Sequence, residues 1–112
     1  MDTKNAITSL AALAQDMRLA VFRLLVATGP EGLAASKIAE SLGVPPSSLS
    51  FHLTELTHAG LLVPRQAGRF VIYAVNFDTM NALLGFLTEN CCSGNPCSPV
   101  IGVECETPAA RS

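Results

Sequence analysis

The residues best suited to chemistry in this 112-residue sequence are its four cysteines, which all lie in the last quarter of the chain. Cys91, Cys92 and Cys97 are closely spaced, and thiolates without a nearby histidine or carboxylate cluster favour a soft, thiophilic ion over magnesium or calcium. Residues 93–96, Ser-Gly-Asn-Pro, can form a turn that folds Cys97 back over the other two thiols. We therefore predict a pyramidal three-sulfur site for arsenic(III), with antimony(III) as the alternative ion and no organic cofactor. Cys105 is left out of this site.

Other uses of these thiols remain open. Oxidation would join Cys97 to Cys91 or Cys92, because adjacent cysteines are awkward partners for each other, and this would make the chain a redox or persulfide sensor. A thiol enzyme is disfavoured, since a reactive cysteine needs a cation, a metal or a helix N-terminus, whereas this cluster follows an expected helix C-terminus. An inert tail is the third alternative. We expect no enzymatic activity.

The length and composition of the chain limit the kind of fold that can position these cysteines. The chain has the length of one domain, and its 49% hydrophobic and 14% charged residues predict that part of the surface lies in a homodimer interface. No apolar run reaches the roughly 20 residues of a membrane span, and the first nine residues lack the pattern of a secretory signal. The expected location is therefore cytoplasmic, where such cysteines favour a metal, metalloid or redox site over structural disulfides.

Hydrophobic spacing predicts a mainly α fold with a small β-hairpin. Apolar periodicity, caps and stops indicate helices over about residues 7–14, 16–28, 35–42, 45–59 and 78–90. The first carries the apolar stripe Ile7, Leu10, Ala11 and Ala14, and Asp16 is the expected N-cap of the second. Gly43-Val44-Pro45 joins two short helices as in a helix-turn-helix, and residues 62–75 alternate like a hairpin with its tip at 66–68. We predict a dimeric winged helix-turn-helix over residues 1–90 and a cysteine-containing tail over 91–112.

The helix over residues 45–59 has two different sides. Leu49, Leu53 and Leu56 form a narrow stripe for packing, while the opposite side carries hydroxyls, an imidazole and the aromatic ring of Phe51. Hydroxyls can bond phosphates or base edges, and an apolar ring can touch a thymine methyl group. The net charge of −2 is unfavourable for binding nucleic acid, but between residues 35 and 75 three basic residues face two acidic ones, a balance of +1.

The segment as a whole resembles the recognition helix and wing of the ArsR/SmtB family of metal-responsive repressors. The likeness rests on Ser47-Ser48-Leu49-Ser50-Phe51-His52-Leu53, followed by Leu56, Ala59-Gly60-Leu61-Leu62, Arg65, Gly68-Arg69 and Tyr73. Members of that family are homodimers that bind an inverted-repeat operator and dissociate when the inducer binds. The resemblance implies that Ser47, Ser48, Ser50 and His52 face DNA and that Arg65 and Arg69 lie on the wing. Lys37 and Phe51 complete the expected contacts, and His52 has an alternative role as a hydrogen-bonded boundary residue.

Two inducer sites that occur in this family have no counterpart here. The stretch Leu33-Ala34-Ala35-Ser36-Lys37-Ile38 has no thiol where some members carry a cysteine pair, and no histidine follows Asp78. The C-terminal cysteine triad resembles instead that of an arsenic-responsive subgroup. Since Leu87 and Cys91 continue one apolar stripe of the last helix, we predict that the metalloid acts on the dimer interface and so releases the operator.

Overall fold

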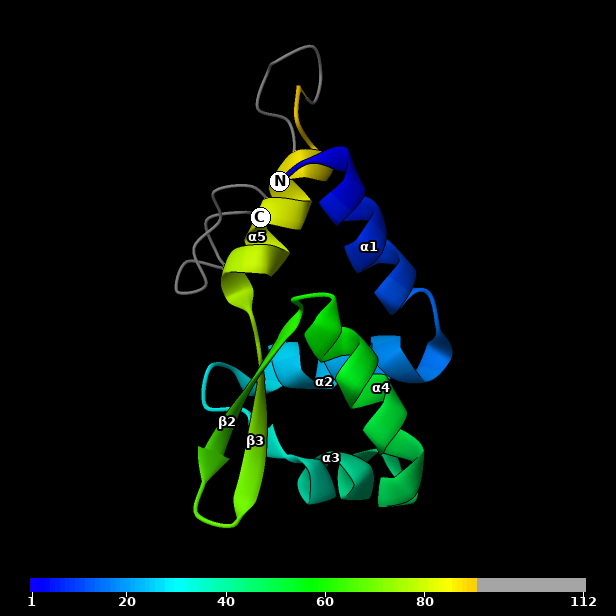
Figure 1. Ribbon diagram of the computed structural model, residues 1–112, viewed down its shortest axis with the longest axis vertical. Coiled ribbons are helices and arrows are strands. Elements are labelled where there is room, and N and C mark those ends of the chain that lie inside the picture. Colours follow the sequence, from blue (N-terminus) through cyan, green and yellow to red (C-terminus); the bar gives the residue numbers. More distant parts are fainter. Residues whose placement is uncertain (91–112) are drawn as a thin grey trace, which may run out of the picture.

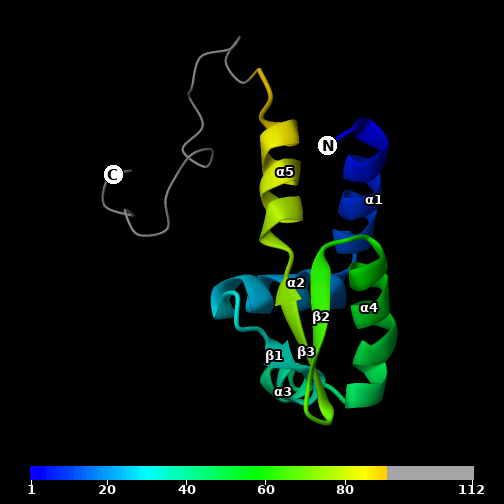
Figure 2. The ribbon, with the colours of Figure 1, turned by 60° about the vertical axis from the view of Figure 1, so that its left-hand side comes forward.

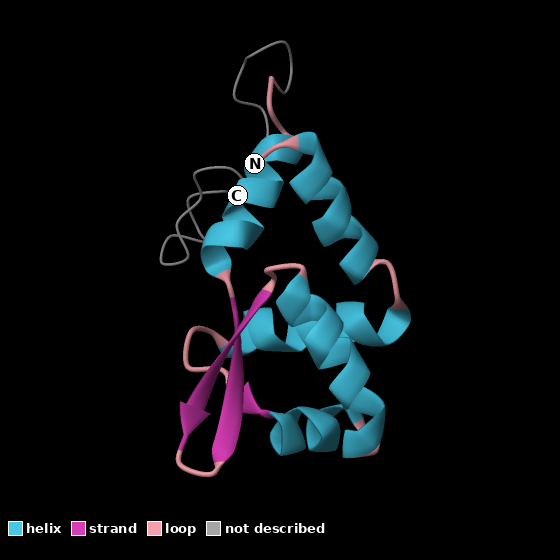
Figure 3. Cartoon of the chain, viewed as in Figure 1, coloured by secondary structure: helices cyan, strands magenta, loops and turns pink. Residues whose placement is uncertain are grey.

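The computed structural model describes residues 1–90, so Cys91, Cys92, Cys97 and Cys105 lie outside the described residues. The elements, in chain order, are α1 (Thr3–Leu13), α2 (Asp16–Thr28), β1 (Leu33–Ala34), α3 (Ala35–Leu42), α4 (Pro46–His58), β2 (Leu62–Ala67), β3 (Phe70–Val75) and α5 (Phe77–Leu87). Helices α2, α3 and α4 pack together beside the hairpin, while α1 and α5 rise side by side at the other end (Figures 1 and 3). The predicted winged helix-turn-helix is confirmed.

The core lies where the leucine stripe of α4 meets α2 and α3. Leu49, Leu53 and Leu56 are all buried, as predicted, and they pack with Val21 and Leu25 of α2. Residues just outside the predicted stripes, among them Phe22 and Leu61, complete the same cluster. Burial of these side chains fixes α4 against the rest of the domain, and the polar side of α4 is left on the surface.

The hairpin differs from the sequence prediction in its turn. The register runs from Leu62↔Val75 to Ala67↔Phe70, which leaves a two-residue turn of Gly68 and Arg69, so the predicted tip at 66–68 is wrong by one residue. Gly68 has a φ of 63°, and two-residue hairpin turns need positive φ at their first position. The short strand β1, which the sequence analysis missed, pairs with β3 and gives a three-stranded sheet of order β1-β3-β2.

Helix boundaries and the first helix also need corrections. Gln15, not Asp16, caps α2, because its side chain accepts a hydrogen bond from the backbone N–H of Arg18. The buried residues of α1 are small (Ala6, Ser9 and Ala12), whereas the larger residues of its predicted stripe, Ile7 and Leu10, are 61% and 41% exposed. Small residues let α1 approach its neighbours closely and leave the bulky apolar side chains on the surface of a single chain.

Helix α5 is shorter than predicted. It begins at Phe77, with the side chain of Asn76 as its N-cap, and ends at Leu87 with Thr88 as its C-cap. Asn90 takes a left-handed φ of 61°, so the predicted continuation of the helix to residue 90 is wrong. The apolar stripe of α5 therefore ends at Leu87 and does not reach Cys91 as helix. Within residues 1–90, no helix is both long and apolar enough to cross a lipid bilayer.

Gly32 is the glycine on which the sheet depends. It has a φ of 69°, and a Cβ placed there would collide with the backbone carbonyl oxygen of Tyr73, the residue that pairs with Leu33. A side chain at this position would thus both strain the backbone and push β1 away from β3.

We expect Gly32→Ala to lower the free energy of unfolding by more than about 2 kcal/mol, since the left-handed conformation alone costs about 1 kcal/mol and the clash adds to it. Gly60→Ala is the matched control: Gly60 has a φ of 81°, but a Cβ there would meet nothing within 4 Å. Gly60→Ala should lower the free energy of unfolding by only about 1 kcal/mol. Urea unfolding at one fixed protein concentration measures both, and equal losses would contradict the proposed clash.

Candidate nucleic-acid interface

The turn between α3 and α4 sets the direction of the exposed helix. Gly43 has a left-handed φ of 67°, and the backbone N–H groups of Gly43 and Val44 both donate to carbonyls of the last turn of α3. Pro45 is extended and Pro46 opens α4, a position at which the missing N–H of proline costs nothing. The predicted turn and both predicted helices are confirmed here.

Helix α4 lies at the edge of the molecule with one long side uncovered within residues 1–90 (Figure 2). Four of the predicted DNA-facing residues of α4 are exposed: Ser47, Ser48, Ser50 and Phe51. In Figures 1 and 2 the hairpin tip reaches the same end of the molecule as α3 and the start of α4. The fold thus brings the predicted helix and wing residues to one end, while their contact with DNA stays a prediction.

Phe51 and His52 are held from α2 by a residue that the sequence analysis missed. The Arg18 Nε–H donates to His52 Nδ1 over 3.2 Å, and the Arg18 guanidinium carbon lies 5.4 Å from the centroid of the Phe51 ring. The Phe51 and His52 rings meet edge to face, 5.8 Å apart. His52 thus makes the hydrogen bond that its alternative boundary role predicts, and its contact with DNA stays a prediction. No local pattern could reveal Arg18, because it lies 34 residues before its partner.

The two predicted wing arginines behave differently. The Arg65 Nη2 donates to the backbone carbonyl of Glu31 over 3.1 Å, which ties this side chain to the loop before β1. Arg69 lies in the turn itself and has no hydrogen-bond or ion-pair partner among residues 1–90. The Gln66 Nε2 donates to the carbonyl of Gly68 and steadies the tip. Arg69 is thus the wing cation best placed to meet a phosphate.

Lys37, the predicted phosphate contact on α3, forms an ion pair with Glu40 over 3.5 Å. Both side chains are well exposed, at 66% and 74%, so solvent screens the pair and it holds Lys37 only weakly. The side chain of Lys37 can therefore exchange this partner for a phosphate.

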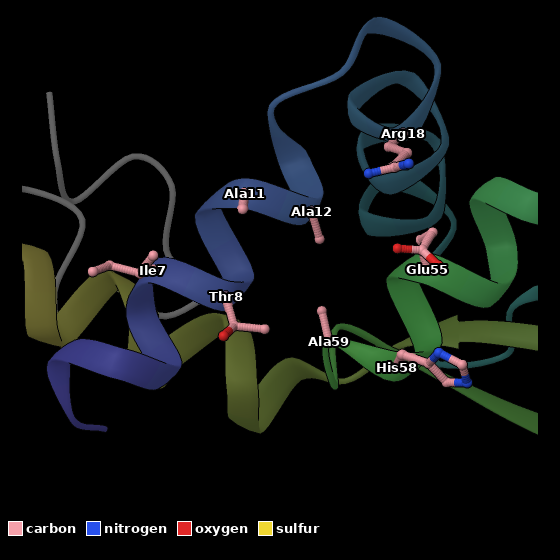
Figure 4. A pocket seen from close by; sticks show the side chains of 8 residues that line it. All are labelled: Ile7, Thr8, Ala11, Ala12, Arg18, Glu55, His58 and Ala59. Carbon is pink, nitrogen blue, oxygen red and sulfur yellow. The ribbon is translucent and has the colours of Figure 1, made fainter.

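A cleft of about 380 Å³ lies beside Arg18, between α1 and α4 (Figure 4). Small or apolar residues of α1, polar residues of α2 and α4, and the residue that follows α4 line it: Ile7, Thr8, Ala11, Ala12, Arg18, Glu55, His58 and Ala59. Arg18 thus lines this cleft and also contacts Phe51 and His52 of α4. Within residues 1–90, no three histidine, cysteine, aspartate or glutamate side chains are grouped so that they could hold a metal ion.

Comparisons with known proteins agree with this geometry. A family model described as a helix-turn-helix domain matches residues 13–65. NolR from Sinorhizobium fredii is 30% identical, with 77% of this chain and 83% of that chain covered and a TM-score of 0.61. A homodimeric winged helix-turn-helix DNA-binding domain from Mycobacterium bovis, described as a possible ArsR-family transcriptional regulator, is 25% identical, with 83% and 86% covered and a TM-score of 0.63.

A third solved structure, described as a possible transcriptional regulator for arsenical resistance, is 28% identical. The comparison covers 70% of this chain and 79% of that chain, with a TM-score of 0.61. No protein with a curated description matches the chain.

Arg69→Ala should weaken binding to duplexes of any sequence and reduce the slope of log affinity against log salt concentration by about 1, the loss expected for one phosphate contact. The control is Arg23→Ala, because Arg23 is exposed on α2 about 140° round the helix from Arg18. Fluorescence anisotropy with a labelled duplex at several salt concentrations measures the slope. An unchanged slope for Arg69→Ala, or the same reduction for Arg23→Ala, would place the phosphate contact elsewhere.

Proposed function

The chain belongs to the ArsR family of winged helix-turn-helix transcriptional regulators, and we propose that it is an arsenic(III)-responsive repressor. In this proposal a homodimer binds operator DNA through α4 and the wing and dissociates when arsenic(III) binds the C-terminal thiols. The observation that carries the DNA-binding half is the position of α4, which packs by its leucines and leaves Ser47, Ser48, Ser50 and Phe51 exposed.

The exposed side of α4 has the chemistry of a major-groove reader. Serine hydroxyls can bond phosphates or base edges, and the Phe51 ring, 60% exposed, is suited to a thymine methyl group. Lys37 on α3 and Arg69 in the hairpin turn add positive charge at the end of the molecule where α4 begins (Figure 1). Because two recognition helices must meet half-sites about one DNA turn apart, this interface works only in a dimer of defined spacing.

A homodimer is supported by the apolar surface of α1 and α5. Ile7 and Leu10 on α1 and Leu87 on α5 are exposed large apolar residues, and the two helices contact each other. Burying such residues against a second copy removes them from water. The similar domain from Mycobacterium bovis is described as homodimeric.

The arsenic(III) half rests on the composition of the chain beyond residue 90. Cys91, Cys92 and Cys97 supply three soft ligands, and a similar structure is described as a possible regulator for arsenical resistance. Antimony(III) has the same preference for thiolates and should act in its place. The site begins four residues after the end of α5, so a ligand bound there would act next to the proposed dimer surface.

Release of the operator then follows from thermodynamic coupling. If ordering the thiols around arsenic(III) shifts α5 and with it the spacing of the two α4 helices, the metalloid and the DNA each weaken the binding of the other by the same factor. Couplings of this kind amount to about 1 to 3 kcal/mol, or about 5- to 150-fold in affinity.

Arsenite should weaken operator binding of the wild-type protein by about 5- to 150-fold, whereas the triple variant Cys91→Ser, Cys92→Ser, Cys97→Ser should bind the operator equally well with and without arsenite. Cys105→Ser is the matched control and should respond like wild type. An anisotropy titration under reducing conditions, with arsenic counted per chain by mass spectrometry, gives both binding curves.

Two results would contradict this assignment. Release of DNA from the triple variant by arsenite would move the inducer site away from these thiols. Release of wild-type DNA by an oxidant or a persulfide, with no response to arsenite, would make the protein a thiol redox sensor of the same fold instead.

A further inference from the structure

Three contacts converge on the first turn of α2 and the middle of α4. Arg18 donates through Nε to His52 Nδ1, its guanidinium lies over the Phe51 ring, and the two rings touch edge to face. Arg18 and His52 are both half-buried, so this contact is shielded in part from water. The cluster joins α2, which does not face DNA in the proposed function, to Phe51 and His52 of α4, the helix that does.

The direction of the Arg18–His52 hydrogen bond determines which imidazole nitrogen carries the hydrogen. A guanidinium has donors and no acceptor, so His52 Nδ1 must accept with its lone pair. A neutral imidazole carries its one hydrogen on the other nitrogen in that case. His52 therefore has a donor at Nε2 as long as Arg18 holds Nδ1.

The Nε2–H of His52 has no partner among residues 1–90, and its nitrogen is not fully buried. In that part of the chain no buried side-chain nitrogen or oxygen lacks a hydrogen-bond partner. Since no hydrogen bond from Nε2 occurs there, this nitrogen cannot be one of the buried atoms. It is thus a donor of fixed identity on the helix that carries the exposed serines.

We propose that Arg18 is a positioning residue that makes His52 a hydrogen-bond donor to the operator. The acceptor would be a base edge in the major groove, either a purine N7 or guanine O6. With Arg18 also over the Phe51 ring, the same residue places a donor next to an apolar surface on α4. This inference rests on the DNA-binding half of the proposed function and is independent of arsenic.

The two amide substitutions of His52 separate its two nitrogens. The Oδ1 of asparagine replaces Nδ1 as an acceptor for Arg18, and His52→Asn loses the outer donor. The Nε2 of glutamine replaces the imidazole Nε2 as a donor, and His52→Gln loses the acceptor for Arg18. If the role of His52 is purely structural, His52→Asn should keep the preference for the operator. If His52 contacts DNA, His52→Gln should keep more of that preference than His52→Asn does.

The experiment uses the full chain and an operator enriched from a random duplex library by the wild-type protein, with an unrelated duplex for comparison. His52→Asn should reduce the preference for the operator by about 2- to 12-fold, the worth of one neutral hydrogen bond, with an unchanged Tm. His52→Gln should lose less. Arg18→Met should reduce the preference too, and by a smaller factor in the His52→Asn background than in the wild type.

Two further measurements directly test which nitrogen of His52 carries the hydrogen and which DNA atom accepts it. Nitrogen-15 NMR of the wild-type imidazole should show a bare Nδ1 and a protonated Nε2, and Arg18→Met should mix the two tautomers. An operator built with 7-deazapurines should abolish the difference between wild type and His52→Asn if the acceptor is a purine N7. It should leave the difference intact if the acceptor is guanine O6.

The outcomes are distinguishable. A protonated Nδ1 in the wild type, an unchanged preference in His52→Asn, or an effect of Arg18→Met that is equally large with and without His52→Asn would each overturn the role of Arg18. A wild-type protein that enriches no sequence from the library would overturn the proposed function itself, and this role with it. If Arg18→Met does not fold, the pair of His52 variants and the wild-type tautomer still decide the matter.

Discussion

The burial of three leucines on one side of α4 is the constraint from which the rest of this structure follows. Leu49, Leu53 and Leu56 are removed from water against α2 and α3, and this fixes the rotation of α4 about its own axis. A helix rotated by even one residue would bury a serine and expose a leucine. The apolar contact thus decides which polar side chains lie on the surface, although none of the leucines takes part in binding.

Much of this arrangement could be predicted from local sequence because its signals are local. The glycine and prolines around residues 43–46, the leucine spacing of α4 and the glycine of the hairpin each act within a few residues, and the structure has the elements they indicate. Arg18 could not be predicted in this way, since its partner His52 comes from another helix. The buried side of α1 was missed for a different reason: small residues were buried there, and hydrophobicity alone pointed to the larger Ile7 and Leu10.

The two ends of the domain are joined through the segment that follows α4. The backbone N–H of Asn76 donates to the carbonyl of Leu61 over 2.9 Å, so the junction of β3 and α5 is bonded to the junction of α4 and β2. Leu61 is itself fully buried. The start of α5 is therefore tied to the C-terminal end of α4 by a backbone contact. This geometry suits a domain in which one end contacts a second subunit and the other faces a ligand.

The outer strand of the hairpin has a further consequence for the behaviour of the protein at high concentration. β2 is the longer of the two edge strands of the sheet, and Val63, on β2, and Phe70, on β3, leave apolar surface on the hairpin. Such an edge invites strands of other molecules to pair with it and aggregate. Pro64 stands within β2, where its missing N–H interrupts the row of donors that an added strand would need. Pro64 thus protects the wing from self-association while leaving its tip exposed.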